Sequence, residues 1–234
     1  MRPPFPYTIF PLGETALVVD FGNVIDVDIN RYVLTLFHHF TNKKLNGVAD
    51  IVPAYSSLSF HYDVFTIRKY YPSTTAFDIL KKIIEDELLK DIQPGELSNR
   101  RISIPVCYDP IFATDIEFVA HEKGMSMEHL IEQHTRQTYI VYMIGFLPGF
   151  AYMGEVDDSI AVPRKIQPAN VAAGSVGIAG KQTGIYPFNS PGGWQIIGRT
   201  PLKLFDKEKD EPVLLQPGDE IKFYSITKDE FKDY

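Results

Sequence analysis

The stretch Gly174–Pro201, with the sequence GSVGIAGKQTGIYPFNSPGGWQIIGRTP, most constrains what this chain can fold into. It holds seven of the 16 glycines, three prolines and the single tryptophan of the chain. Each glycine costs a helix about 1 kcal/mol relative to alanine, so this density excludes a helix. Isoleucine, valine and aromatic residues between the glycines need burial, so the stretch is not a disordered linker either. We expect short strands joined by tight turns, with Ser190–Gly193 as one such turn.

Polar side chains are threaded through this framework, and rigid turns that present them beside a tryptophan indicate a binding surface. Arg199 suits bidentate binding of a carboxylate or phosphate, but a structural salt bridge to an acid such as Asp206 is an equal alternative. The segment Gly145–Gly154, GFLPGFAYMG, is aromatic and rich in turn residues. It predicts either a loop packed into a barrel core or one wall of an apolar pocket, with Arg164 as a source of charge.

The charge balance and composition exclude several classes of function. The net charge is −7 and the positive charges are scattered, whereas a nucleic-acid binder needs a basic stripe that neutralises phosphates. No apolar run reaches the roughly 18 residues that a membrane span needs, and the proline-rich N-terminus lacks a signal-peptide core. The only cysteine, Cys107, excludes an intramolecular disulfide. We expect a cytoplasmic protein that binds neither nucleic acid nor membrane.

Changes of pattern along the chain predict two domains. Residues 1–90 combine short β-rich runs with amphipathic helices, which predicts a small α/β domain. Residues 91–101 are polar and aperiodic, so they predict a linker. Residues 102–234 start a new β pattern that includes the glycine-dense stretch, and the polar residues 227–234 are expected to fray.

The segment that precedes the aromatic stretch Gly145–Gly154 contains residues typical of helix starts, and three histidines. Thr114, followed three residues later by Glu117, has the form of a capping box. The three histidines of residues 121–134 lack the spacing of metal ligands, so the sequence predicts no metal site here. His134 precedes the strand that leads into the aromatic segment, and it is a candidate general base.

No nucleotide-binding or hydrolase motif explains the glycine-dense stretch. Gly174-x-x-Gly177-x-x-Gly180 superficially matches a dinucleotide loop, but no amphipathic helix follows it to hold a pyrophosphate. A GxxxxGK[ST] loop and a GxSxG elbow are both absent. The residues by themselves therefore leave the chemistry open.

Several long motifs, spread over nearly the whole chain, are specific enough to identify a family. They are Gly13–Leu17, Val52–Leu58, Ile104–Tyr108, Gly145–Gly154, Ala173–Gly180, Gln182–Pro187, Ser190–Trp194 and Ile197–Pro201. In these motifs the chain resembles the KipI/PxpB family, also called allophanate hydrolase subunit 1. The family usually has proline at Ala172 and often an arginine within Pro168-Ala169-Asn170, so an upstream basic contact is not carried over.

The resemblance implies an α+β N-terminal domain followed by a mainly-β cyclophilin-like barrel domain. It also implies the PxpB component of an ATP-dependent 5-oxoprolinase, which opens the lactam of 5-oxo-L-proline to L-glutamate with a KipA-like PxpC subunit and PxpA. The isolated chain is then expected to be inactive. ATP, with Mg²⁺, would be held by the complex, and this chain would bind no metal. Activating a lactam by phosphorylation requires fixed donors for anionic charge.

The resemblance places a substrate pocket in the barrel, leaves the catalytic residues unknown and keeps His134 as a candidate acid or base. The expected pocket residues are Phe150, Tyr152, Gln182, Tyr186, Ser190, Trp194, Arg199 and Thr200. Two alternatives stay open. One is an inhibitor that binds a sensor histidine kinase through the same barrel face, and the other is a subunit of a urea- or allophanate-type amide-processing enzyme.

Overall fold

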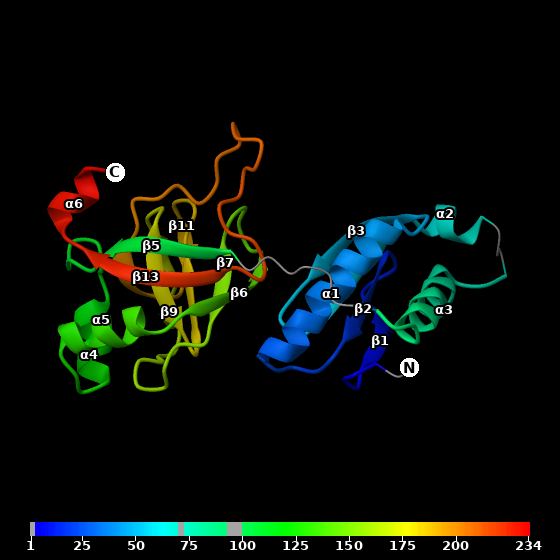
Figure 1. Cartoon of the computed structure of the whole chain (residues 1–234), viewed down its shortest axis with the longest axis horizontal. Helices are drawn as coiled ribbons and strands as arrows, with labels where there is room; N and C mark the ends of the chain where they lie inside the picture. The colour runs from blue at the N-terminus through cyan, green and yellow to red at the C-terminus, as the bar shows by residue number, and fades with distance from the viewer. Residues whose placement is uncertain (1–2, 70–72, 93–99) are drawn as a thin grey trace. The chain divides into compact units, whose positions relative to one another are not determined.

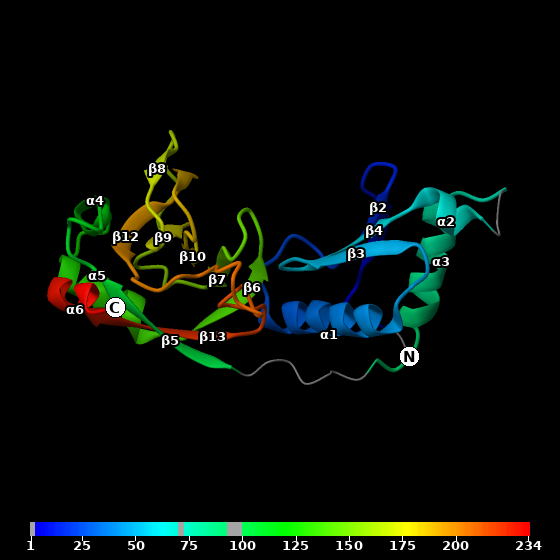
Figure 2. The same ribbon diagram turned by 90° about the horizontal axis from the view of Figure 1, so that it is seen from above.

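The computed structural model describes residues 3–69, 73–92 and 100–234, and the chain divides into two compact units (Figure 1, Figure 2). One unit comprises Met1–Leu97 and the other Ser98–Tyr234. The linker expected at 91–101 lies largely outside the described residues, because 93–99 are not among them. Within the described ranges, no helix combines the length and the apolar character that crossing a membrane requires.

The N-terminal unit contains a four-stranded antiparallel sheet in the order β1-β2-β4-β3. Apolar residues of its first helix, among them Val33, Leu36 and Phe40, recur at helical spacing and are fully buried in one core with Leu17 and Phe60 of the sheet. The elements are β1 (Thr8–Pro11), β2 (Ala16–Asp20), α1 (Val27–Lys43), β3 (Val48–Pro53), β4 (Ser57–Tyr62), α2 (Val64–Arg68) and α3 (Ala76–Leu88).

A nearly buried carboxylate joins α1 to α3. The Glu87 side chain is 8% exposed, and its oxygens lie 3.1 Å from His39, 3.3 Å from Lys43 and 2.6 Å from Lys90. Burial by itself raises the pKa of Glu87, but hydrogen bonds from Lys90, His39 and Lys43 outweigh it and lower the pKa to about 2. Glu87 is therefore ionised at neutral pH, where it stabilises the packing of the two helices.

Glu87→Gln is expected to lower the free energy of unfolding of this unit by about 1–3 kcal/mol at pH 7. Because the pKa of folded Glu87 is depressed, this contribution is complete above the ordinary value of 4.5 and is lost as the pH falls toward about 2. Denaturant unfolding of both proteins across that pH range measures the difference. A difference that stays constant at acid pH would contradict this account.

The same helix offers a matched control for this experiment. Glu85 lies 3.9 Å from Lys81, and its side chain is 43% exposed. Water screens such a pair, so Glu85→Gln should change the stability by less than about 0.5 kcal/mol at any pH.

The C-terminal unit is built around a closed seven-stranded barrel in the order β10-β7-β6-β13-β5-β12-β9. Neighbouring strands are antiparallel, except that β5 and β13 are parallel. The expected barrel is confirmed, and three of its strands come from the glycine-dense stretch. The strands are β5 (Arg101–Cys107), β6 (Tyr139–Ile144), β7 (Ala151–Gly154), β9 (Ser175–Ala179), β10 (Gln182–Ile185), β12 (Gln195–Arg199) and β13 (Glu220–Ile226).

Helices α4 (Ile116–Glu122), α5 (Met127–Arg136) and α6 (Lys228–Lys232) and a two-stranded sheet complete this unit. In that sheet β8 (Ala169–Val171) pairs with β11 (Ser190–Gly192). The turn expected at Ser190–Gly193 is therefore wrong for most of its length, because β8 supplies a pairing partner. The expectation that 227–234 frays is also wrong, because a capping box starts α6 there.

An ion pair between the partly exposed Arg100 and a fully buried carboxylate fixes the start of β5 beside the turn that precedes β13. Asp219 is fully buried, and Arg100 donates to both of its carboxylate oxygens, from Nε at 2.9 Å and from Nη2 at 2.6 Å. The backbone N–H of Gln216 donates to the same carboxylate at 2.7 Å, and Nη2 of Arg100 also reaches the Leu214 carbonyl. The pair therefore joins the start of β5 to the turn before β13, two segments that lie far apart in the sequence.

Candidate functional site

Arg199, the last residue of β12, lies between two grooves on the C-terminal unit. The first groove, of about 360 Å³, has Phe112, Asp115, Lys165, Asn170, Ser175 and Arg199 among its lining residues. The second groove, of about 380 Å³, has Gly174, Arg199, Thr200, Phe231 and Tyr234 among its lining residues. Arg199 thus lines both grooves and can contact a ligand bound in either one.

The guanidinium group of Arg199 is fixed at one edge and open at the other. Its Nε donates to the Ala173 carbonyl at 2.8 Å, and its central carbon lies 5.8 Å from the centre of the Phe112 ring. Within the described ranges no carboxylate pairs with it, and Asp206 instead pairs with Lys203 at 3.1 Å. The salt-bridge alternative for Arg199 is therefore wrong, and its terminal N–H groups are available to an anion.

The conformation of Gly174 lets the ends of β10 and β12 lie close to each other beside Arg199. Its φ is +82°, and a Cβ atom there would lie 2.3 Å from the Thr200 carbonyl oxygen. Its N–H donates to the Tyr186 carbonyl at 2.7 Å, and its own carbonyl accepts from the Thr200 N–H at 2.9 Å. Only glycine satisfies both the left-handed φ and the close backbone contact, so Gly174 holds the ends of β10 and β12 together.

An ion pair forms part of the first groove. Nζ of Lys165 lies 2.7 Å from Oδ2 of Asp115, and both side chains are largely buried. The same oxygen accepts from the Ile196 N–H at 2.6 Å, which ties the groove wall to β12. The cap expected at Thr114 is wrong. Helix α4 begins after Asp115 without a side-chain capping bond, because that carboxylate bonds β12 and Lys165 instead.

The four aromatic residues expected at the pocket gather in one cluster. The Phe150 ring centre lies 4.7 Å from Tyr152, 5.1 Å from Tyr186 and 5.5 Å from Trp194. Tyr152 is half-buried and the other three are buried. Burial raises the pKa of both tyrosines, and the nearby Arg164 opposes this without reversing it. Both hydroxyls therefore stay protonated at neutral pH.

This cluster is connected to the first groove. Val171 and Ile196 pack in the core of the aromatic cluster and also line the groove that contains Arg199. Trp194 is buried and precedes the first residue of β12, whereas Arg199 ends that strand. The two are therefore linked through Val171 and Ile196. The aromatic rings support the groove wall from behind, because most of their area is buried.

Ser190 and Thr200 lie at separate places around this region. Thr200 is buried beside the second groove, and its hydroxyl accepts from the Leu202 N–H at 3.3 Å. Ser190 lies in β11 and lines a further groove with Asn189. Its hydroxyl oxygen is buried and has no hydrogen-bond partner within the part of the chain that the structure describes.

The structure does not bring Gln182 to Arg199. Both residues pair with β9, but Gln182 is opposite Ala179, whereas Arg199 is opposite Ser175 at the other end of the strand. Four residues of strand, about 13 Å, separate the two positions. The family resemblance implied one pocket for both residues, but β10 starts at the opposite end of β9 from Arg199.

His134 is enclosed in the barrel interior. The Tyr108 hydroxyl lies 2.7 Å from its Nδ1, and Thr183 Oγ1 lies 3.1 Å from its Nε2. Thr183 donates its own proton to the Gly177 carbonyl at 3.0 Å, so Nε2 must carry the hydrogen and Nδ1 must accept from Tyr108. Burial lowers the pKa of His134 to about 3. We therefore assign His134 a structural role in place of the expected acid–base role.

NMR of the imidazole nitrogens should show neutral His134 with its hydrogen on Nε2 well below pH 6. The unfolded chain binds this proton near the ordinary pKa of 6.5 and the folded chain does not, so stability should fall as the pH drops from 6.5 toward about 3. His134→Leu leaves the buried Tyr108 hydroxyl without an acceptor and should cost about 1–3 kcal/mol. His129→Leu, at a half-exposed position of α5, is the control. Titration of His134 near pH 6.5 would refute this assignment.

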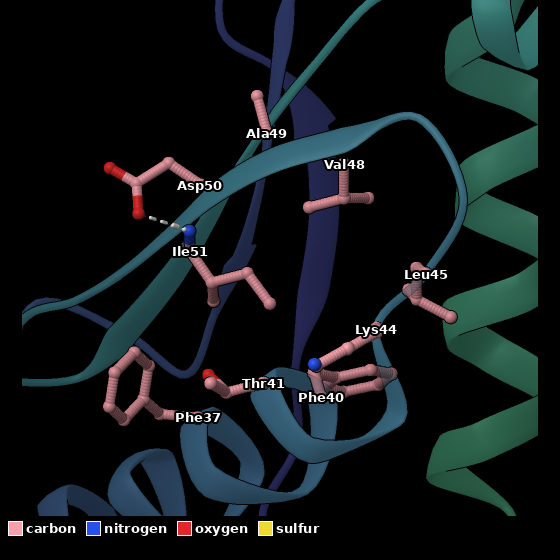
Figure 3. Close-up of a pocket in the computed structure, with 9 residues that line it drawn as sticks. All are labelled: Phe37, Phe40, Thr41, Lys44, Leu45, Val48, Ala49, Asp50 and Ile51. Carbon is pink, nitrogen blue, oxygen red and sulfur yellow. Dashed lines mark hydrogen bonds between the residues drawn. The ribbon is translucent and has the colours of Figure 1, made fainter.

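A separate groove of about 410 Å³ lies in the N-terminal unit between α1 and β3 (Figure 3). Phe37 and Ile51 contribute apolar wall, and the Asp50 carboxylate accepts from the Ile51 N–H at 2.8 Å. The residues expected from the sequence to bind substrate all lie in the other unit. In residues 3–69, 73–92 and 100–234, no group of three or more His, Cys, Asp and Glu side chains is placed to hold a metal.

Comparison with known proteins gives consistent matches over the chain. The family model described as carboxyltransferase domain, subdomain C and D, matches residues 7–215. The B component of 5-oxoprolinase from Bacillus subtilis (strain 168) is 39% identical over 231 residues, which are 97% of this chain and 96% of that protein.

Two solved structures resemble this one. A conserved uncharacterized protein from Pyrococcus horikoshii is 43% identical, with a TM-score of 0.55, over 96% of this chain and 100% of that one. The urea carboxylase of Kluyveromyces lactis has a TM-score of 0.75 and 20% identity over 97% of this chain, which spans only 22% of that longer protein. At that identity the likeness supports the fold alone.

Proposed function

Because the chain belongs to the carboxyltransferase subdomain C and D family, which includes the KipI/PxpB proteins, we propose that it is the PxpB component of an ATP-dependent 5-oxoprolinase. The reaction converts 5-oxo-L-proline, ATP and water to L-glutamate, ADP and phosphate. The partners are a KipA-like PxpC subunit and PxpA. Near full-length identity of 39% to the corresponding component of 5-oxoprolinase from Bacillus subtilis supports this assignment.

Arg199 is the observation that connects this function to the structure. The substrate is a small anion with one carboxylate next to a lactam ring. A guanidinium group presents parallel N–H donors that match a carboxylate, and among the described residues none accepts a hydrogen bond from the terminal N–H groups of Arg199. Its bond to Ala173 and its contact with the Phe112 ring together restrict the side chain, so binding costs little further rotamer freedom. Arg199 therefore holds the substrate carboxylate.

The remaining chemistry belongs to the complex. A lactam is a resonance-stabilised amide, and transfer of the ATP γ-phosphoryl group to its oxygen makes the ring carbon a better electrophile for water. In this scheme the chain binds and orients the substrate, and a partner protein supplies the rest of the enclosure. ATP with Mg²⁺ is held by the complex, so the chain by itself is inactive.

The direct test is to purify this chain with PxpC-like and PxpA-like subunits and to measure ATP hydrolysis that depends on 5-oxoproline, together with glutamate formation. Activity should require all three proteins. An intact trio without activity would overturn the proposal. ATP hydrolysis driven by urea, and not by 5-oxoproline, would instead favour the amide-processing alternative.

A further inference from the structure

The aromatic contact that restrains Arg199 continues into helix α6. The Phe112 ring, on which the guanidinium lies, stacks on Phe231 with ring centres 4.5 Å apart and an interplanar angle of 27°. Phe231 belongs to α6, which follows β13 directly (Figure 1). We propose that Phe231 is a positioning residue for Arg199, acting through Phe112, and thereby sets the affinity for the substrate anion. This inference rests on the proposed role of Arg199.

Helix α6 is short, so its position depends on specific contacts. Five residues are too few for a helix that is stable by itself. The Thr227 N–H donates to the Glu230 carboxylate at 2.7 Å, and the Glu230 N–H donates back to the Thr227 hydroxyl at 3.2 Å. Beyond the helix, the Tyr234 hydroxyl lies 2.9 Å from that of Tyr224 on β13. These bonds hold Phe231 in register with the barrel.

The stack matters because the backbone fixes only one edge of the guanidinium group. The bond from Nε to the Ala173 carbonyl still leaves the plane of the group free to tilt. The face of the Phe112 ring restricts that tilt, and an aromatic face also attracts a cation. Phe112 is itself half-buried in a loop before α4, and Phe231 covers it. Removing Phe231 therefore loosens Phe112 and, through it, Arg199.

The arrangement of the grooves agrees with this role. Phe112 lines the first groove and Phe231 lines the second, and Arg199 lines both. A ligand carboxylate held by Arg199 lies next to this stack from either groove. Residues 228–232 lie beyond the region that the family model matches, so family membership by itself assigns them no function.

The first experiment measures kinetics in the assembled complex. Phe231→Ala should raise the KM for 5-oxoproline by about 3- to 10-fold, the range expected when the contact of Arg199 with the Phe112 ring is weakened, and leave the KM for ATP unchanged. Phe231→Tyr keeps the ring and should restore the KM. Phe118→Ala, which removes a half-exposed phenyl of α4 outside the stack, is the control. If Arg199→Ala impairs the KM and Phe231→Ala does not, the inference is overturned.

The second experiment needs no activity, so it separates failure of this inference from failure of the proposed function. NMR relaxation of the Arg199 Nε–H group should report an ordered side chain in the full chain and a mobile one in Phe231→Ala. Equal order in both proteins would overturn the inference even if the complex is active. Increased mobility in an inactive complex would support the stack and count against the 5-oxoprolinase assignment alone.

Discussion

Arg199→Ala is expected to reduce 5-oxoproline-dependent turnover of the assembled complex by about 100-fold or more, as loss of a fixed charged donor does at other enzyme sites. Its melting temperature should fall by only a few degrees, because within the described part of the chain this side chain makes one hydrogen bond, to the Ala173 carbonyl, worth about 1 kcal/mol. Arg199→Lys should not restore turnover, since an ammonium group cannot form two parallel hydrogen bonds to one carboxylate.

Steady-state assays and thermal unfolding of the same preparations test this expectation. Arg101→Ala is the matched control, because Arg101 is 84% exposed, pairs with Glu220 and starts β5, whereas Arg199 is opposite Cys107 at the other end of that strand. It should leave both turnover and melting temperature nearly unchanged. A large drop in the melting temperature of Arg199→Ala would show that Arg199 is a structural residue, and the proposed carboxylate site would then fail.

Asp219→Ala is expected to have the largest effect on stability, a loss of about 3–5 kcal/mol in the free energy of unfolding of the C-terminal unit. The substitution leaves the Arg100 guanidinium and the Gln216 N–H without their buried acceptor. The neighbouring acid Glu220 is 29% exposed in its pair with Arg101, so Glu220→Ala should cost less than about 1 kcal/mol.

A double-mutant cycle with Arg100→Ala measures the coupling between the two charges. Because each single variant already removes the contact between the two charges, the double variant should cost clearly less than the sum of the two single variants. Strictly additive losses would mean that the two residues stabilise the barrel independently, which the bidentate contact does not allow.

The barrel and its aromatic cluster could be predicted from the sequence because their signals are local. Gly174 and Gly177 exclude a helix and let neighbouring strands approach closely. The aromatic residues near Trp194 must then be buried against those strands. Arg199 was identified for a similar reason, since a guanidinium group among rigid turns is suited to anion binding. The structure retains each of these features and removes the competing salt bridge to Asp206.

Other parts of the site had no local signal. Asp115 resembles any residue at the start of a helix, and only its contact with Ile196, 81 positions away, shows that it supports the groove. Phe231 lies in a polar segment expected to fray, and its stacking on Phe112 anchors that segment to the barrel unit. His134 was a candidate base on sequence order alone, but enclosure beside Tyr108 and Thr183 keeps it neutral.

The glycine-dependent β-barrel and the family of this chain can therefore be inferred from the order of its amino acids. These properties follow from backbone preferences and from motifs that lie within a few residues of one another. The folded structure was needed to show that Arg199 has no carboxylate partner among the described residues, that Gln182 is distant from it and that Phe112 and Phe231 stack beside it. Each of those facts depends on contacts and strand register between distant segments, which local preferences do not encode.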